Sequence, residues 1–424
     1  MNSSWSALRH SAFRRLWLTS AISGICVAAH DNAATYVMNS LAGSPVFISL
    51  ISIAASLPFF LFTIPAGFLA DRVNRKKLLC AINLWLAAGA FGLAVFGWLN
   101  LLSPYLILLC VFIIGAGFAF NAPTWTSVVA QVVPERDLAS VATLNGLQFN
   151  ISGIIGPALG GLLLPIIGAN LIFAANAACF LLVLLALFTW KQSSRGSDLP
   201  IQKRTHNPAL AGCDSDGVQY LRSTPRLQSI LVRNFEFSLF ISAIPAVVPI
   251  IGLKVFHFNS SDLGLLFTSM GAGSVFAALF ILPWVRQHFS RNALTFSNSF
   301  VVVVYILMAS IDQRVFFFPA AALAGAAWTV SASELWVAGQ QAIPDWARGR
   351  LTAGIMTISQ GATVLGGVIW SGLVALTGPS HVLLIAATLF LTSMVLSKLP
   401  YGKLRLLARA SDLPDGTAAA PGIA

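Results

Sequence analysis

The chain has 424 residues, of which 57% are hydrophobic and 9% are charged, and its formal net charge is +11. Because about a quarter of the residues of soluble globular proteins are charged, this composition excludes a soluble fold and indicates a membrane protein. At roughly 35 residues for each apolar helix and its connection, the length accommodates about twelve transmembrane helices. Little chain is left for an extramembrane enzyme domain.

Twelve apolar segments follow one another, six before a polar stretch and six after it. The first six lie near 16–38, 46–69, 78–99, 102–124, 140–166 and 168–190. The second six lie near 227–251, 262–285, 293–311, 315–340, 351–375 and 380–398. We therefore expect an all-α membrane protein of twelve transmembrane helices in two six-helix bundles. The expected units are an N-terminal bundle at 1–190, a linker at 191–226, a C-terminal bundle at 227–398 and a tail at 399–424.

The basic residues gather on one side when the loops are assigned alternately to the two sides of the membrane. With both termini on one side, that side holds nearly all of the 25 Lys and Arg residues. The opposite side holds only Lys254 and Arg314, and Arg233 lies within a segment. This asymmetry predicts that both termini and the linker are cytoplasmic. It also explains the net charge through topology and contact with anionic lipid, so nucleic-acid binding is not expected.

The two halves match each other locally. Val133–Arg136, which opens the fifth segment, corresponds to Ile343–Trp346, which opens the eleventh. Internal repeats of this kind occur in transporters whose binding site lies between two bundles near the membrane midplane. We therefore expect such a site here.

The sharpest motif is Gly67–Lys77, with the sequence GFLADRVNRKK, at the end of the second segment. A basic loop that merely stops membrane insertion would explain the cations, but it would not explain Gly67 and Asp71 at this spacing. The run resembles the signature of the major facilitator superfamily, in the position where that superfamily carries it, and the resemblance covers nearly the whole chain. It implies a conformational latch between the bundles, formed by Gly67, Asp71, Arg72 and Arg75.

Further motifs resemble the enterobactin-exporter-like branch of that superfamily, the transmembrane secretion effectors. They are Phe13–Trp17, Ala42–Pro45, Gly156–Gly161, Gly325–Trp328 and Pro344–Arg350. The resemblance implies a multi-pass transporter in the plasma membrane, the inner membrane of a bacterium. It also implies secondary active transport by alternating access of the two bundles.

The glycine–proline run in the fifth segment resembles the motif of antiporters and exporters. Pro157 removes a backbone hydrogen bond and kinks the helix, while the glycines offer a smooth face to a neighbouring helix. The expected helix hinge is Gly156, Pro157, Gly160 and Gly161. Three features depart from the family pattern. The spacing upstream of Gly156 differs from the full antiporter motif, Gly153 stands where this branch often has an arginine, and Gln287 stands where an acid would match Asp71. The expected latch is therefore one-sided.

Acidic residues within apolar segments are costly, so each is a functional hypothesis. Asp31 lies about 24 Å beyond Arg15 along a helix, near or just past the bilayer centre. It belongs to a small or polar stripe of Ser20, Gly24, Ala28, Asp31 and Thr35. Asp31 is either a pore residue that binds protons or substrate, helped by His30, or a structural acid bonded to another helix. His30 by itself is interpreted as a hydrogen-bonded polar side chain.

Two further acids lie in the second half. Glu236 and Arg233 are three residues apart on one helix face, so they form either a local ion pair or, for Glu236, a second titratable pore group. Glu334 lies about 15 Å inside the membrane from Pro344 and is either a substrate determinant or an acid solvated near the interface. Four amides can line the pore or join helices: Asn145, Gln148, Asn150 and Gln360.

The function expected is proton-coupled efflux of a small amphipathic compound, siderophore-like or drug-like, with protonation of Asp31 as the switch. An importer of a sugar or organic acid and a non-transporting membrane sensor remain open. The five cysteines are scattered without metal-type spacing and are interpreted as small hydrophobic residues. We expect no metal site, cofactor or enzymatic activity, and the expected partners are the substrate, protons and the lipid bilayer, with the protein acting as a monomer.

Overall fold

The computed structural model describes residues 5–42, 44–134, 137–189, 224–289, 292–343 and 348–396. The expected tail and all but the last residues of the expected linker fall outside these ranges. Within the described residues the chain is almost entirely helical and contains no strand.

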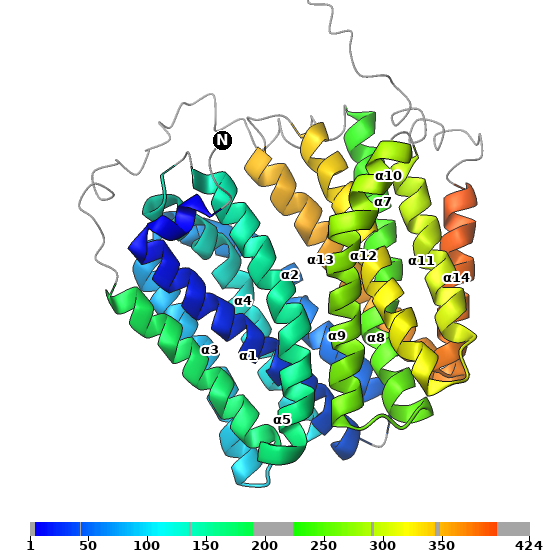
Figure 1. Ribbon diagram of the computed structural model, residues 1–424, viewed down its shortest axis with the longest axis horizontal. Coiled ribbons are helices and arrows are strands. Elements are labelled where there is room, and N and C mark those ends of the chain that lie inside the picture. The colour runs from blue at the N-terminus through cyan, green and yellow to red at the C-terminus, as the bar shows by residue number, and fades with distance from the viewer. Residues whose placement is uncertain are drawn as a thin grey trace, which may run out of the picture.

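The first half consists of long helices with short connections (Figure 1). They are η1 (Ser6–Arg9), α1 (Ser11–Leu41), α2 (Val46–Arg72), α3 (Arg75–Trp98), α4 (Pro104–Val132) and α5 (Leu138–Thr189). The 52 residues of α5 cover the fifth and sixth predicted segments. Gly168 divides α5 into two arms, because its φ of 78° and ψ of 163° are not helical. Only glycine adopts this conformation at low cost, so the sequence places the turn at this position.

The second half has more interrupted helices. They are α7 (Pro225–Ile241), α8 (Ala243–Ile250), η5 (Ile251–Val255), α9 (Ser260–Phe276), η6 (Ala277–Ile281), α10 (Leu282–His288), α11 (Ala293–Ala309), α12 (Arg314–Ala342), α13 (Arg348–Thr377) and α14 (Pro379–Leu396). Both η5 and η6 are π-helical turns. Pro249 precedes η5 by two residues and Pro283 follows η6 by two. Proline lacks an amide hydrogen, so a local change of hydrogen-bond register beside it is expected.

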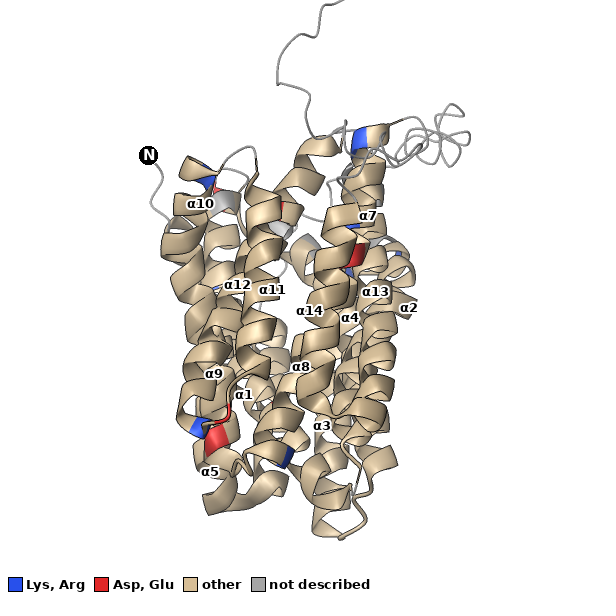
Figure 2. Cartoon of the chain, turned by 90° about the vertical axis from the view of Figure 1, so that its right-hand side faces the viewer, with Lys and Arg blue, Asp and Glu red and all other residues tan. Residues whose placement is uncertain are grey.

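Nine helical segments of the described residues are long and apolar enough to cross a membrane, and α11 is apolar but shorter. Charged residues lie mostly near the two ends of the helices, with an uncharged band between them (Figure 2). Many large apolar side chains point outward within that band, among them Phe91 of α3, Leu185 of α5 and Leu389 of α14. An apolar exterior of this extent marks contact with lipid.

The helices form two groups (Figure 1). In the first group α5 packs on α1 and α3, and α2 packs on α4. In the second group α12 packs on α9 and α11, and α13 packs on α7. We call the end of the molecule where α1 begins and α14 ends the terminal end, and the opposite end the distal end.

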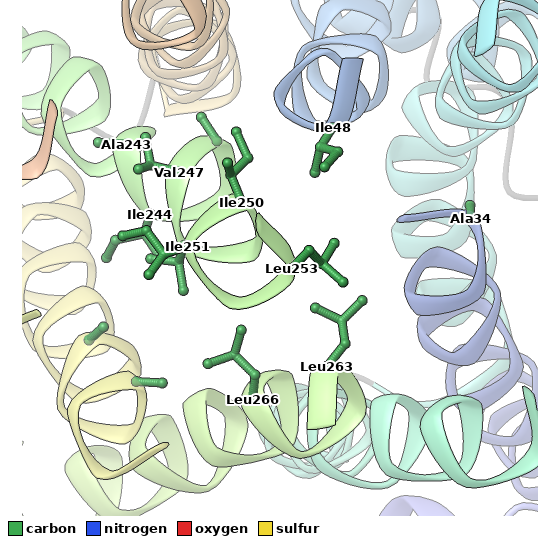
Figure 3. Close-up of a cluster of buried hydrophobic side chains, with 14 of the residues drawn as sticks. Ala34, Ile48, Ala243, Ile244, Val247, Ile250, Ile251, Leu253, Leu263 and Leu266 are labelled. Atoms are coloured by element: carbon green, nitrogen blue, oxygen red, sulfur yellow. The ribbon is translucent and has the colours of Figure 1, made fainter. Parts of the chain in front are cut away.

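The groups meet through α5 with α9 and through α2 with α13 and α8. One apolar core cluster continues across this contact. Figure 3 shows Ala34 of α1 and Ile48 of α2 on one side of it, facing Leu253 and Leu263 of the second group. All four are buried, and they lie toward the distal ends of their helices, so the groups are joined there.

Candidate transport pathway

The closest contact between the two groups runs along α5 and α9. Two hydroxyl groups of α9 donate hydrogen bonds to backbone carbonyls of α5. Ser261 Oγ lies 3.2 Å from the carbonyl oxygen of Gly161, and Thr268 Oγ1 lies 3.0 Å from that of Ile154. Small residues and hydroxyl side chains are typical of helix pairs that approach closely in membranes.

Glycines make this approach possible. A Cβ added to Gly264 would lie 2.5 Å from the carbonyl oxygen of Pro157, and one added to Gly271 would lie 2.5 Å from that of Gly153. A Cβ on Gly153 itself would have no atom within 4 Å. Backbone therefore contacts backbone over about two turns, and the contact depends on the glycines of α9.

The predicted hinge glycines lie against two neighbouring helices. A Cβ on Gly156 would lie 2.5 Å from Cβ of Ala28, and one on Gly160 would lie 2.8 Å from the carbonyl oxygen of Ala29, so both face α1. A Cβ on Gly161 would meet Ser260 and Gly264, so this glycine faces α9. The expectation of a single smooth face is therefore wrong: α1 and α9 lie against different sides of the motif.

Toward the terminal end the two groups separate. Phe149 precedes Gly153 by four residues on the same face of α5, yet it is 81% exposed. On α2, Phe60 lies against Gly361 of α13 and is 41% exposed, and Phe68, about two turns further on, is 62% exposed. Exposure on α5 and α2 thus increases toward the terminal end, where the two groups lie farther apart (Figure 1).

The side chain of Asp31 is exposed, although α1 lies within the packed first group. Ile22, nine residues earlier on α1, is 49% exposed. Nine residues make two and a half helical turns, so the two side chains point to opposite sides of α1. Among the described residues, no hydrogen bond or ion pair involves the Asp31 carboxylate.

The residues on either side of Asp31 each contact α5. The His30 ring packs on Phe173 of the second arm of α5, with 4.7 Å between ring centroids. Asn32 Nδ2 donates a hydrogen bond to the carbonyl oxygen of Pro157 on the first arm, at 3.2 Å. Asp31 therefore lies between a residue that contacts the second arm and a residue that contacts the first.

His30 departs from its expected role. The ring is buried, and neither ring nitrogen has a hydrogen-bond partner among the described residues, contrary to the expectation of a hydrogen-bonded side chain. The ring packs on Phe173, whereas the Asp31 side chain is exposed. The structure therefore does not bring His30 and Asp31 together.

Arg233 and Glu236 lie on α7 but do not pair. No ion pair joins them in the part of the chain that the structure describes, and Glu236 Oε1 is buried there without a hydrogen-bond partner. The intervening Asn234 joins α7 to α13, with its Nδ2 2.5 Å from Ser359 Oγ and 3.3 Å from the carbonyl oxygen of Ile355. The spacing permits a local ion pair, but the side chains do not adopt it.

Glu334 has a partner that the sequence did not indicate. Its Oε1 accepts a hydrogen bond from Arg286 Nε at 2.7 Å, which joins α12 to α10 near the terminal end. The Glu334 side chain is 13% exposed and that of Arg286 is 46% exposed. Neither proposed role of Glu334, substrate determinant or solvated acid, anticipates this ion pair.

Replacing Arg286 with Ala is expected to lower the free energy of unfolding by about 1 kcal/mol, a value typical of a partly exposed ion pair. Thermal unfolding in detergent measures the change. Arg226→Ala is the matched control, because Arg226 is exposed on α7 at the same end. In a double-mutant cycle, Arg286→Ala should add little to Glu334→Gln, and fully additive effects would contradict the pairing.

The four predicted amide residues differ in their hydrogen-bond partners. Gln148 Nε2 donates to the carbonyl oxygen of Ser20 at 3.1 Å and joins α5 to α1, whereas Asn150 donates within its own helix. Asn145 Oδ1 is buried without a partner among the described residues. Gln360 is half-buried on α13. Gln148 thus joins two helices, which leaves Asn145 and Gln360 as pathway candidates.

The latch residues are only partly described. Asp71 lies in α2, but its side chain is outside the described part of the structure. Arg72 is exposed and Arg75 half-buried, and neither forms an ion pair with another described residue. No atom would lie within 4 Å of a Cβ on Gly67, so this glycine makes no close helix contact in this conformation.

Known proteins resemble the chain over most of its length. The family described as transmembrane secretion effector matches residues 2–414. Macrolide efflux protein A of Streptococcus pyogenes is 23% identical over 306 residues, which is 72% of this chain and 74% of that protein. The enterobactin exporter of Citrobacter koseri is 25% identical, over 64% of this chain and 63% of that protein. The staphyloferrin A transporter of Staphylococcus aureus is 22% identical, over 77% and 80%.

Solved structures share the fold. A nucleoside transporter superposes with a TM-score of 0.71 at 14% sequence identity. The superposition covers 91% of this chain and 99% of the transporter chain. A D-xylose–proton symporter superposes with a TM-score of 0.72 at 12% sequence identity, and the superposition covers 92% of this chain and 98% of the symporter chain. The resemblance to major facilitator exporters that the sequence motifs indicated is thereby confirmed. The chain belongs to the transmembrane secretion effector family of major facilitator transporters, and it is a multi-pass protein of the bacterial plasma membrane.

Proposed function

We propose that the protein, as a monomer, exports a small amphipathic compound in exchange for protons. Export and the substrate class, siderophore-like or drug-like, are extended from the relatives, whose names describe macrolide efflux, enterobactin export and staphyloferrin A transport. The observation that carries the proton coupling is Asp31, an exposed acid without a partner among the described residues, and we place its carboxylate in the space between the two helix groups. An acid in such a place is costly to ionise, so its protonation state can bias the conformation.

The proposed topology has twelve membrane crossings. Each arm of α5 makes one crossing, α7 with α8 and η5 makes one, and α9 with η6 and α10 makes one. The proposed bundles are 1–190 and 227–398, joined by a cytoplasmic linker at 191–226, with a cytoplasmic tail at 399–424. The basic residues support a cytoplasmic terminal end, since Arg72, Arg75 and Arg286 lie there.

With this topology the structure is inward-facing. The space between the bundles opens to the cytoplasm, while the contact of α5 with α9 closes the outer side. A substrate would enter from the cytoplasm and meet Asp31. After the bundles rock to the outward-facing state, an external proton would neutralise Asp31 and release the substrate. The proton would then return to the cytoplasm, and the carboxylate would be ready for the next molecule.

Transport in proteoliposomes tests this function. With an acidic interior, we expect a macrolide or enterobactin to accumulate inside through the molecules whose cytoplasmic face is outward, and a protonophore should abolish the accumulation. Empty liposomes are the control. Sugar or organic-acid flux in the opposite direction would favour an importer. Absence of any substrate-dependent proton flux across a panel of amphipathic compounds would favour a sensor.

A further inference from the structure

Two cysteines that are distant in the sequence meet in the middle of the first bundle. Sγ of Cys26 on α1 lies 3.0 Å from Sγ of Cys179 on the second arm of α5, although 153 positions separate the residues. Both are free thiols. A disulfide bond is about 2.0 Å long, so the two sulfur atoms need to approach by only about 1 Å to form one. The other free cysteines of the described chain, Cys80 and Cys110, have no such neighbour.

The two thiols differ in access. Cys26 is partly exposed, whereas Cys179 is buried. One turn before Cys26, Ile22 is 49% exposed, and one turn after Cys179, Leu182 is 47% exposed. These exposed side chains are apolar and lie on helices within the membrane band, so the open side of the pair faces lipid. A reagent dissolved in the bilayer would reach Cys26 first and leave Cys179 as the second thiol.

The interior side of the pair is closed. One turn beyond Cys26 on α1, the His30 ring packs on Phe173 of the same arm of α5 that carries Cys179. The ring contact and the thiol contact therefore belong to one interface between α1 and this arm. The ring contact beside the thiols holds them in register, so oxidation would join them to each other in preference to thiols of another molecule.

We propose that Cys26 and Cys179 form a redox-modification site at which an organic hydroperoxide dissolved in the bilayer closes a disulfide between α1 and α5. The Cys26 sulfur attacks the terminal oxygen of the hydroperoxide, the O–O bond breaks and an alcohol leaves, which gives a sulfenic acid. The Cys179 sulfur then attacks the Cys26 sulfur, the S–O bond breaks, and the hydroxyl leaves with the thiol proton as water. Two thiols are oxidised, and one hydroperoxide is reduced to an alcohol.

The bond would fix α1 to the second arm of α5 about one and a half turns from Asp31. Both cysteines lie in the first bundle, so the bond would not join the two bundles directly. It would restrict how α1 shifts within its own bundle, next to the residue proposed to carry the proton. Through this site, oxidants dissolved in the membrane would modify this region of the protein covalently.

The test uses the full chain in lipid vesicles with Cys80, Cys110 and Cys213 replaced by Ser. After treatment with cumene hydroperoxide and denaturation, the remaining thiols are labelled with a maleimide and the intact mass is measured. We expect loss of both labelled thiols and of the mass of two hydrogen atoms, and dithiothreitol should restore labelling. Two matched controls are a chain that keeps only Cys80 and Cys110 and one that keeps only Cys26, neither of which should form the intramolecular bond.

Peptide mapping of the unsubstituted chain is a second measurement, and it does not require the cysteine variants to fold. Oxidation should yield a linked peptide that contains both Cys26 and Cys179. Thiols that both stay reactive toward maleimide after the treatment, or disulfides that form only between chains, would overturn the proposal. Because these readouts need no transport, the result is independent of the function proposed above.

Discussion

Replacing Asp31 with Asn is expected to reduce proton-driven transport in proteoliposomes to the rate of protein-free liposomes. Asn retains the size and polarity of the side chain but cannot ionise, so proton binding no longer changes its charge. Since no described residue pairs with the carboxylate, the substitution leaves no other charge unpaired and should not unfold the protein. Thermal unfolding of the variant should match that of the wild type.

Two further variants make this test specific. Asp31→Glu keeps a carboxyl group at the same position and should retain proton-driven transport, although at a lower rate. Asp312→Asn removes an acid that is exposed in the connection between α11 and α12, and transport should stay unchanged. If Asp31→Asn transports as fast as the wild type under a proton gradient, Asp31 is not the coupling group.

The double substitution Gly264→Ala and Gly271→Ala is expected to slow transport by tenfold or more. Each added methyl group would lie 2.5 Å from a backbone carbonyl oxygen of α5, which cannot move without displacing the helix. Overpacking of this kind costs about 1–3 kcal/mol for each site. In the proposed cycle the contact exists only while the outer side is closed, so that cost would disfavour the inward-facing state relative to the outward-facing one by a factor of ten or more.

Gly153→Ala is the matched control for this pair. Gly153 lies in the same contact, yet a Cβ there would have no atom within 4 Å, so transport should stay near the wild-type rate. Distances between spin labels at the outer ends of α5 and α9 report the conformational shift directly. Unchanged distances in the Gly264→Ala, Gly271→Ala variant would show that this contact does not set the conformational equilibrium.

Local patterns predicted the helices well. Apolar runs indicated the helical segments that the structure describes, because burial in lipid requires a long apolar sequence and an internally hydrogen-bonded backbone. The helix breaks at Gly168, which is the first residue of the predicted segment 168–190. The π-helical turns η5 and η6 were not predicted, since a proline indicates a disturbed helix but not which register the backbone takes beside it.

The sequence predicted which residues belong to the site better than it predicted which residues they contact. Asp31 was selected from its cost in an apolar segment; its side chain is exposed, and its role in the pathway stays a prediction. Arg233 and Glu236 have the spacing of a helical ion pair, but the described structure does not pair them. Glu334 was selected as an intramembrane acid, and its pairing with Arg286, 48 positions away, depends on where the fold places α12 relative to α10.

The sequence by itself determined the membrane class, the helical segments, the distribution of basic charge and the family, because each depends on residue type and on spacing along the chain. The tertiary structure alone decided which side of α5 faces α1 and which faces α9, where the bundles separate, and that Cys26 lies against Cys179. These features depend on the rotation and separation of whole helices. Hydropathy is nearly uniform around such helices and does not encode that rotation, so it became visible only when the helices were packed.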